Sequence, residues 1–169
     1  MQSAALELVC AQGRLSWPGG STRAAVGRGG VSASKREGDG ATPAGTFLLL
    51  SILYRRDRLR APACGVPVRE IAPQDGWVDD PLDANYNRLV SLPYPASAEH
   101  LWRADAVYDL VVVIGYNVEP VVPGAGSAIF LHIARSDFSP TAGCVAIARD
   151  ALIGLADQIT PGSTITIRL

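Results

Sequence analysis

Glycine and proline interrupt this chain so often that they leave little room for long helices. The 169 residues include 17 glycines and 12 prolines, and both residue types end helices or break their hydrogen bonding. The stretch 150–159 contains one glycine and no proline. From Asp150, which is placed to cap a helix, apolar side chains recur at helical spacing to Ile159, and Pro161 then ends the pattern. The pattern therefore predicts a chain rich in strands, with one helix near its C-terminus.

Several short segments have the composition and the alternation of β-strands. Leu6, Leu8 and Cys10 alternate with their neighbours before Gly13, which suits a hairpin turn. Later segments include continuous apolar runs of a length typical of buried strands. The predicted strands cover residues 6–10, 14–17, 46–54, 109–115, 127–133 and 164–169. The expected fold class is mainly β.

The composition indicates a folded chain that acts on a small molecule or a peptide. Hydrophobic residues make up 48% of the chain and charged residues 18%, and we expect residues 1–169 to form one domain around a core. The net charge of −1 offers no field to attract nucleic acid, so no nucleic-acid partner is expected. No apolar run approaches the ~20 residues that span a bilayer, and residues 1–17 show no signal peptide.

Two regions are dense in turn-forming residues and predict ordered loops. Residues 27–45 are rich in glycine, serine and charge, and a buried strand is expected directly after them. Prolines recur through residues 55–105, and so long an irregular stretch in a compact domain usually builds a site or a lid. Trp77 lies in this stretch and could line a groove for a peptide or a sugar, although aromatic side chains more often pack in a core.

The strongest chemical signal is a histidine at the end of an apolar strand, followed by a cysteine after a glycine. If His132 and Cys144 meet, the imidazole can take the thiol proton and form a thiolate–imidazolium pair for acyl transfer. Gly143 suits a turn with a positive φ or a close backbone approach, which would let the Cys144 amide face a developing oxyanion. The group that orients His132 is either a backbone carbonyl or Asp137.

These residues also have structural interpretations. A lone cysteine is more often a small buried hydrophobe, and His132 could be a satisfied core histidine. Arg135 could bind a substrate carboxylate or form a surface ion pair. Cys10, Cys64 and Cys144 have no metal-ligand spacing, and no third ligand is evident beside His132 and Cys144, so neither a metal nor another cofactor is expected.

Taken together, the motifs resemble one protein family. Residues 129–145 and 37–47, with 76–81, 86–88 and 108–112, are similar to the L,D-transpeptidase catalytic domain, also called the YkuD domain. The resemblance covers residues 28–169. It implies a β-sandwich of mixed sheets, with one principal helix after the catalytic cysteine and long irregular loops. It also implies a cysteine acyltransferase that joins peptidoglycan stem peptides through an acyl-enzyme.

Site residues follow from the resemblance position by position. Cys144 matches the nucleophile and His132 the base of the family. Thr141 and Gly143 match the first and third residues of the Ser/Thr-His-Gly-Cys signature, and Tyr116 resembles a tyrosine that some members place near the oxyanion. The residues expected to bind substrate are Trp77, Tyr116, Arg135 and Thr141.

One position departs from the signature, and three functions are considered because of it. Ala142 stands where the signature has its second histidine, which gives the Thr-Ala-Gly-Cys of one branch. The favoured function is a transferase that takes a stem peptide as acyl donor and an amine as acceptor. An L,D-carboxypeptidase would use water instead, and a non-catalytic module would only bind cell-wall peptide. Such a substrate implies the periplasm or cell envelope of a bacterium, although no export signal is legible.

Overall fold

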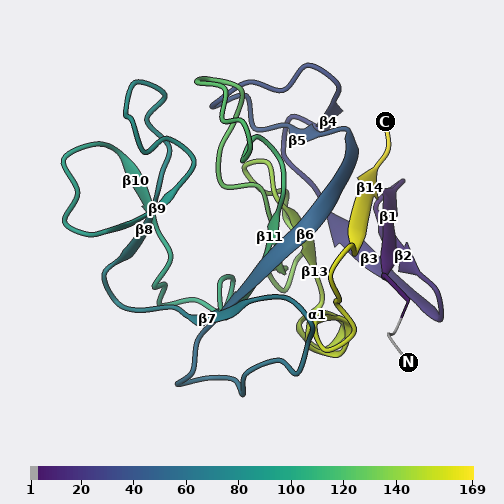
Figure 1. The fold of residues 1–169 in the computed structure, drawn as a ribbon. Coiled ribbons are helices and arrows are strands. Elements are labelled where there is room, and N and C mark those ends of the chain that lie inside the picture. The colour runs from purple at the N-terminus through teal and green to yellow at the C-terminus, as the bar shows by residue number, and fades with distance from the viewer. Residues whose placement is uncertain (1–3) are drawn as a thin grey trace.

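The computed structural model describes residues 4–169, and these have the predicted mainly β fold with one helix (Figure 1). Residues 1–3 of the expected domain lie outside the described residues. The elements are β1 (Glu7–Ala11), β2 (Arg14–Trp17), β3 (Gly20–Ala25), β4 (Val31–Ser32), β5 (Thr42–Pro43), β6 (Gly45–Tyr54), β7 (Val68–Glu70), β8 (Asp75–Val78), β9 (Leu89–Ser91), β10 (Ala98–His100), β11 (Leu110–Ile114), β12 (Phe130–Ile133), β13 (Val145–Ile147), α1 (Arg149–Ala156) and β14 (Thr164–Ile167).

Nine strands form a mixed sheet whose hydrogen bonding closes on itself. Their order is β11-β12-β13-β3-β2-β1-β14-β6-β7, and β11 also pairs with β6. The long strand β6 makes this closure because its first half pairs with β14 and its second half with β11 and β7. One layer therefore holds β1, β2, β3 and β14, and the other holds β11, β12 and β13 (Figure 1). Closure leaves few unpaired strand edges.

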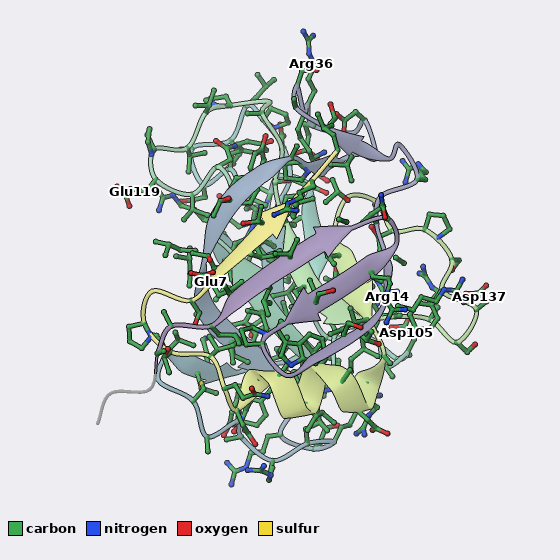
Figure 2. All side chains as sticks on the ribbon, turned by 90° about the vertical axis from the view of Figure 1, so that its right-hand side faces the viewer. Glu7, Arg14, Arg36, Asp105, Glu119 and Asp137 are labelled. Carbon is green, nitrogen blue, oxygen red and sulfur yellow. The ribbon has the colours of Figure 1, made fainter. Side chains whose placement is uncertain are left out.

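The main apolar core lies between the two layers. Leu8 and Ile165 from the first layer join Val112 and Leu131 from the second in one buried cluster. Leu152 of α1 belongs to the same cluster, and Figure 2 shows the helix lying across one end of the strands. The helix thus buries its apolar side against the open end of the sandwich, as its spacing of apolar residues predicts.

The start of α1 differs from the expected one. The cap position is Ala148, without a side-chain cap, and Asp150 lies in the first turn. Only Ala148 separates β13 from α1, so the chain enters the helix before Asp150 can cap it. The Asp150 carboxylate still lies near the positive end of the helix dipole.

Ile159 is buried beyond the end of α1. Within residues 4–169, no helix is long and apolar enough to cross a membrane.

The layer of β11, β12 and β13 buries a second cluster on its other face. Side chains alternate along these strands, so Val111 and Phe130 point away from the main core. The small sheet of β8, β9 and β10 covers them through Trp77, whose ring meets that of Phe130 edge to face, with 5.1 Å between centroids. Cys144 belongs to this cluster, and His132 shares the face because it pairs with Val111.

The region that was expected to be dominated by loops holds four short strands. The strands β7 to β10 have three or four residues each. Pro73, Pro81 and Pro93 lie between them, which agrees with the rarity of proline inside sheets. The prolines therefore mark where these strands end. The pairing of the strands depends on contacts between residues that are far apart in the sequence.

Candidate active site

Two neighbouring parallel strands place Cys144 beside the strand that carries His132. In the pairing of β12 with β13, His132 lies opposite Ala146, and Cys144 immediately precedes β13. The backbone N–H of Phe130 donates to the Cys144 sulfur at 3.4 Å. The thiol in turn donates to the carbonyl oxygen of Ala128 at 3.1 Å. Both His132 and Cys144 line one cavity of about 530 Å³.

Ala128 has an unusual backbone conformation that contributes to the site. Its φ of 52° lies in the left-handed region, where a residue with a side chain is held only by its surroundings. Its amide donates to Oδ1 of Asn87 at 2.9 Å, and its carbonyl accepts the thiol of Cys144. This conformation also explains why β12 begins at Phe130, although the expected strand began at Ser127.

Gly143 meets both conditions that its sequence context predicts. Its φ is +144°, and a Cβ placed on it would lie 3.0 Å from the carbonyl oxygen of Ala41. A side chain would therefore displace the turn that presents Cys144. Thr141 holds the same turn, because its hydroxyl donates to the Cys144 carbonyl at 2.6 Å and accepts from the Gly143 N–H at 3.1 Å.

A backbone carbonyl orients the imidazole. Nδ1 of His132 lies 2.9 Å from the carbonyl oxygen of Ile133. A carbonyl can only accept, so Nδ1 carries the hydrogen and Nε2 keeps its lone pair. Asp137, the other group considered for this task, is exposed at the rim of the molecule and accepts from the amide of Ser139 (Figure 2). The ring of Tyr108 packs edge to face on the imidazole, with 5.2 Å between centroids.

Burial favours the neutral forms of both His132 and Cys144. Burial, together with the charges of Arg103 and Arg135, lowers the pKa of His132 to about 4, although the hydrogen bond to the Ile133 carbonyl acts in the opposite direction. Burial, together with the charge of Glu99, raises the pKa of the Cys144 thiol to about 12. Both shifts disfavour the thiolate–imidazolium pair that the sequence suggests.

The low pKa of His132 predicts a loss of stability in mild acid. Below pH 6.5 the unfolded chain binds a proton that native His132 does not accept until about pH 4. The free energy of unfolding should therefore fall as the pH drops through this window, by about 3 kcal/mol from this one group. Urea unfolding at several pH values measures the fall. His132→Asn should lessen it by that amount, and equal falls in both proteins would contradict the assignment.

The cavity has a balanced set of charges on its walls. It takes in His132 and Cys144 on one side and the small sheet and its loops on the other. Its charged lining residues are Glu37, Asp79, Glu99, Arg28, Arg103 and Arg135. A substrate that carries both carboxylate and ammonium groups therefore fits this cavity better than one with a single kind of charge.

The sequence also matches a known protein family. Residues 8–167 match the model of the L,D-transpeptidase catalytic domain. The chain belongs to this family. No curated protein matches it. L,D-transpeptidase 1 of Mycobacterium tuberculosis has 14% identity and a TM-score of 0.46, and the match covers 96% of this chain and 58% of that structure. An L,D-transpeptidase of Mycobacterium smegmatis has 14% identity and a TM-score of 0.49, with coverages of 98% and 59%. This chain thus spans less than two thirds of either.

Within this L,D-transpeptidase domain, two of the residues expected to bind substrate lie elsewhere. Trp77 is buried in the second cluster, and its indole N–H donates to Oδ1 of Asn87 at 2.8 Å. The hydroxyl of Tyr116 donates to the carbonyl oxygen of Ala125 at 2.6 Å, and its ring packs on Phe47. Neither aromatic residue lines the cavity. Both satisfy their polar atoms inside the protein, so their geometry assigns them to packing.

The other two expected residues do reach the cavity, with different surroundings. Arg135 is exposed and lines the cavity beside His132. Thr141 is buried, and its hydroxyl is hydrogen-bonded within the turn around Gly143 and Cys144. Arg135 is therefore available to a carboxylate, whereas Thr141 shapes the nucleophile turn.

Sequence reasoning missed the polar groups that come from other parts of the L,D-transpeptidase domain. Glu99 of β10 and Tyr108 line the cavity with Cys144, yet neither lies near the signature in the sequence. Glu37 also lines it, and its Oε2 accepts from the hydroxyls of Tyr86 and Ser127. Tyr108 lies in the motif of residues 108–112, and the resemblance assigns it no role. No group of three His, Cys, Asp or Glu suited to a metal occurs within residues 4–169.

Proposed function

We propose that this domain is a cysteine acyltransferase, an L,D-transpeptidase that acts on peptidoglycan stem peptides in the cell envelope. One observation carries the proposal: Cys144, held on a glycine turn, and His132, held with Nε2 free, line the same cavity. Membership of the L,D-transpeptidase family supports it. We further propose that residues 1–169 form a single catalytic domain with no metal or other cofactor in the reaction.

Acylation follows from the neutral resting pair. The Cys144 sulfur attacks the carbonyl carbon between an L-centre and a terminal D-alanine, while Nε2 of His132 takes the thiol proton. The carbon–nitrogen bond then breaks, and the imidazolium returns that proton to the leaving amine. Transfer of the proton during attack avoids a lasting pair of charges in a buried site. The product is a thioester on Cys144 and a free D-amino acid.

Deacylation repeats the same steps with another amine. The acceptor amine attacks the thioester carbon, His132 takes its proton, and the carbon–sulfur bond breaks. The proton then returns to sulfur, which restores the neutral pair. If water replaces the amine, the same steps make an L,D-carboxypeptidase. The acceptor therefore decides between the two activities.

Two further groups have roles in this proposal. The amide of Cys144 is the proposed oxyanion donor, because the neighbouring amide of Gly143 is already bonded to Thr141. A preorganised donor of this kind contributes on the order of 10²–10³ in rate. Arg135, exposed at the cavity wall, is the proposed partner of the terminal carboxylate.

A mass-spectrometric assay with a stem tetrapeptide, with and without an added amine, tests the function. We expect loss of D-alanine with formation of a peptide joined to the added amine. Release of free tripeptide in both reactions would identify a carboxypeptidase and contradict the transferase. Peptide binding without any bond cleavage would identify a binding module, and it would contradict both enzymatic activities.

A further inference from the structure

Two of the three arginines that line the cavity have no acidic partner. The guanidinium of Arg103 forms a two-point pair with the carboxylate of Asp105, at 2.8 and 2.6 Å. Within residues 4–169, neither Arg28 nor Arg135 forms an ion pair with a carboxylate. Both are exposed, and both line the cavity. Their guanidinium groups are therefore available to a bound anion.

The two unpaired arginines are attached to different halves of the catalytic pair. The backbone N–H of Arg28 donates to the carbonyl oxygen of Thr141 at 2.9 Å, and the hydroxyl of Thr141 holds the turn of Cys144. Arg135 lies just beyond β12, the strand that carries His132. Arg28 therefore belongs to the nucleophile side of the cavity, and Arg135 belongs to the side of the general base.

A glycine in the loop beside the cavity makes room for the side chain of Arg28. A Cβ placed on Gly40 would lie 2.9 Å from Cγ and 3.1 Å from Nε of Arg28. Gly40 also has a φ of +67°, which favours glycine. Its carbonyl oxygen accepts from the backbone N–H of Gly29 at 2.9 Å, which fixes the loop to the segment that carries Arg28. The loop thus sets the course of this side chain along the cavity wall.

Two acidic residues of the cavity already accept hydrogen bonds from other partners. Oε2 of Glu37 accepts from the hydroxyls of Tyr86 and Ser127. Oε1 of Glu99 accepts from the hydroxyl of Tyr108 at 2.5 Å. These carboxylates are served by neutral hydroxyls, so the guanidinium groups of the two unpaired arginines remain for a ligand. A guanidinium binds a carboxylate best, through two parallel hydrogen bonds.

We propose that Arg28 is a specificity-determining residue, which binds a second carboxylate of the acyl donor. This carboxylate lies on the side chain of the residue whose carbonyl carbon Cys144 attacks. The inference rests on the proposed function, in which Arg135 binds the terminal carboxylate of the leaving D-alanine. The leaving amine takes its proton from His132, so D-alanine lies on the side of Arg135. The acyl residue stays on Cys144, on the side of Arg28.

The substrate class follows from this placement. A stem peptide with an ionised side-chain carboxylate next to the scissile bond can use both arginines. If that carboxylate is amidated, the charge is lost and Arg28 has no ionic partner. The domain should therefore prefer the free carboxylate over the amide.

Two tetrapeptides that end in D-alanine test the preference. Their third residue is a diamino dicarboxylic acid, with its side-chain carboxylate free in one peptide and amidated in the other. Isothermal titration calorimetry measures their binding to Cys144→Ala, which lacks the proposed nucleophile. We expect the peptide with the free carboxylate to bind at least about fivefold more tightly. Salt at about 1 M should reduce this difference, because it screens an exposed pair of charges.

Variants in this background identify the residue responsible. Arg28→Gln should weaken binding of the free-carboxylate peptide at least about fivefold and change that of the amidated peptide less than about twofold. Arg28→Lys should keep part of the preference, because it keeps the charge without the two-point geometry. Arg135→Gln should weaken both peptides equally, because both have the terminal carboxylate. The matched control is Arg56→Gln, at an exposed arginine outside the cavity that pairs with Glu70, and it should change neither affinity.

Three results would overturn the inference. Equal affinities of the two peptides for Cys144→Ala would show that the side-chain carboxylate is not recognised. Equal weakening of both peptides in Arg28→Gln would give Arg28 a structural role only. A preference that is lost in Arg135→Gln and kept in Arg28→Gln would assign the second carboxylate to Arg135. Circular dichroism checks the fold of each variant, and Arg28→Lys provides the test if Arg28→Gln does not fold.

The inference and the proposed function can fail separately. If the unaltered protein cleaves neither peptide but binds them with a preference that depends on Arg28, the enzymatic function is wrong and the role of Arg28 stands. If it cleaves both peptides and binds them equally, the function stands and the inference is wrong. If neither peptide binds, both are wrong.

Discussion

Replacing Cys144 with serine is expected to reduce the rate of D-alanine release from a tetrapeptide by at least about 10⁴-fold, on the scale of losses seen when other nucleophiles are removed. The serine hydroxyl has nearly the same shape and can still donate to the Ala128 carbonyl. It is a far weaker acid and a weaker nucleophile than a thiol, so its proton is much harder for His132 to take during the attack. The initial rate by mass spectrometry measures the loss.

Cys64→Ser is the matched control for this experiment. Cys64 is half-buried, its thiol donates to the carbonyl oxygen of Val66 at 3.5 Å, and it does not line the cavity. Its serine variant should therefore keep the rate of the unaltered protein. A Cys144→Ser variant that retains a tenth of that rate would remove Cys144 from the role of nucleophile, whatever the control shows.

The parts of the site that local sequence could predict are those that lie close together in the chain. His132 and Cys144 are separated by one loop, and a glycine before a cysteine carries its own backbone requirement, so the pair and the turn were both predictable. The same holds for strands with continuous apolar runs. The position of Asp150 was predicted less well, because the helix start depends on where β13 ends.

The parts that sequence could not predict depend on packing between distant segments. Glu99 meets Tyr108 only because β10 joins the small sheet that covers the site. Trp77 could be read equally as a groove residue or a core residue, and its contact with Phe130 decides for the core. The pKa shifts of His132 and Cys144 could not be predicted from the sequence either. Burial is the largest cause of both shifts, and a motif does not encode burial.

Phe130→Ala is expected to lower the free energy of unfolding by about 3–5 kcal/mol, the range for removing a large aromatic side chain from a core. Phe130 is fully buried in β12, and its ring contacts Trp77 and Tyr108 edge to face. Its loss would leave a void between the main layer and the small sheet. Because Tyr108 borders that void and also lines the cavity with Cys144, activity should fall together with stability. Urea unfolding near neutral pH measures the change.

Leu48→Ala separates this effect from the general cost of shortening an apolar side chain in a strand. Leu48 lies in β6 and is 51% exposed, so its truncation removes little buried surface and should cost under about 1 kcal/mol. Similar losses in the two variants would mean that the second cluster adds little to stability. The small sheet would then be only loosely attached over the site. A large loss in Phe130→Ala alone shows instead that the wall of the cavity and the core of the fold depend on the same ring.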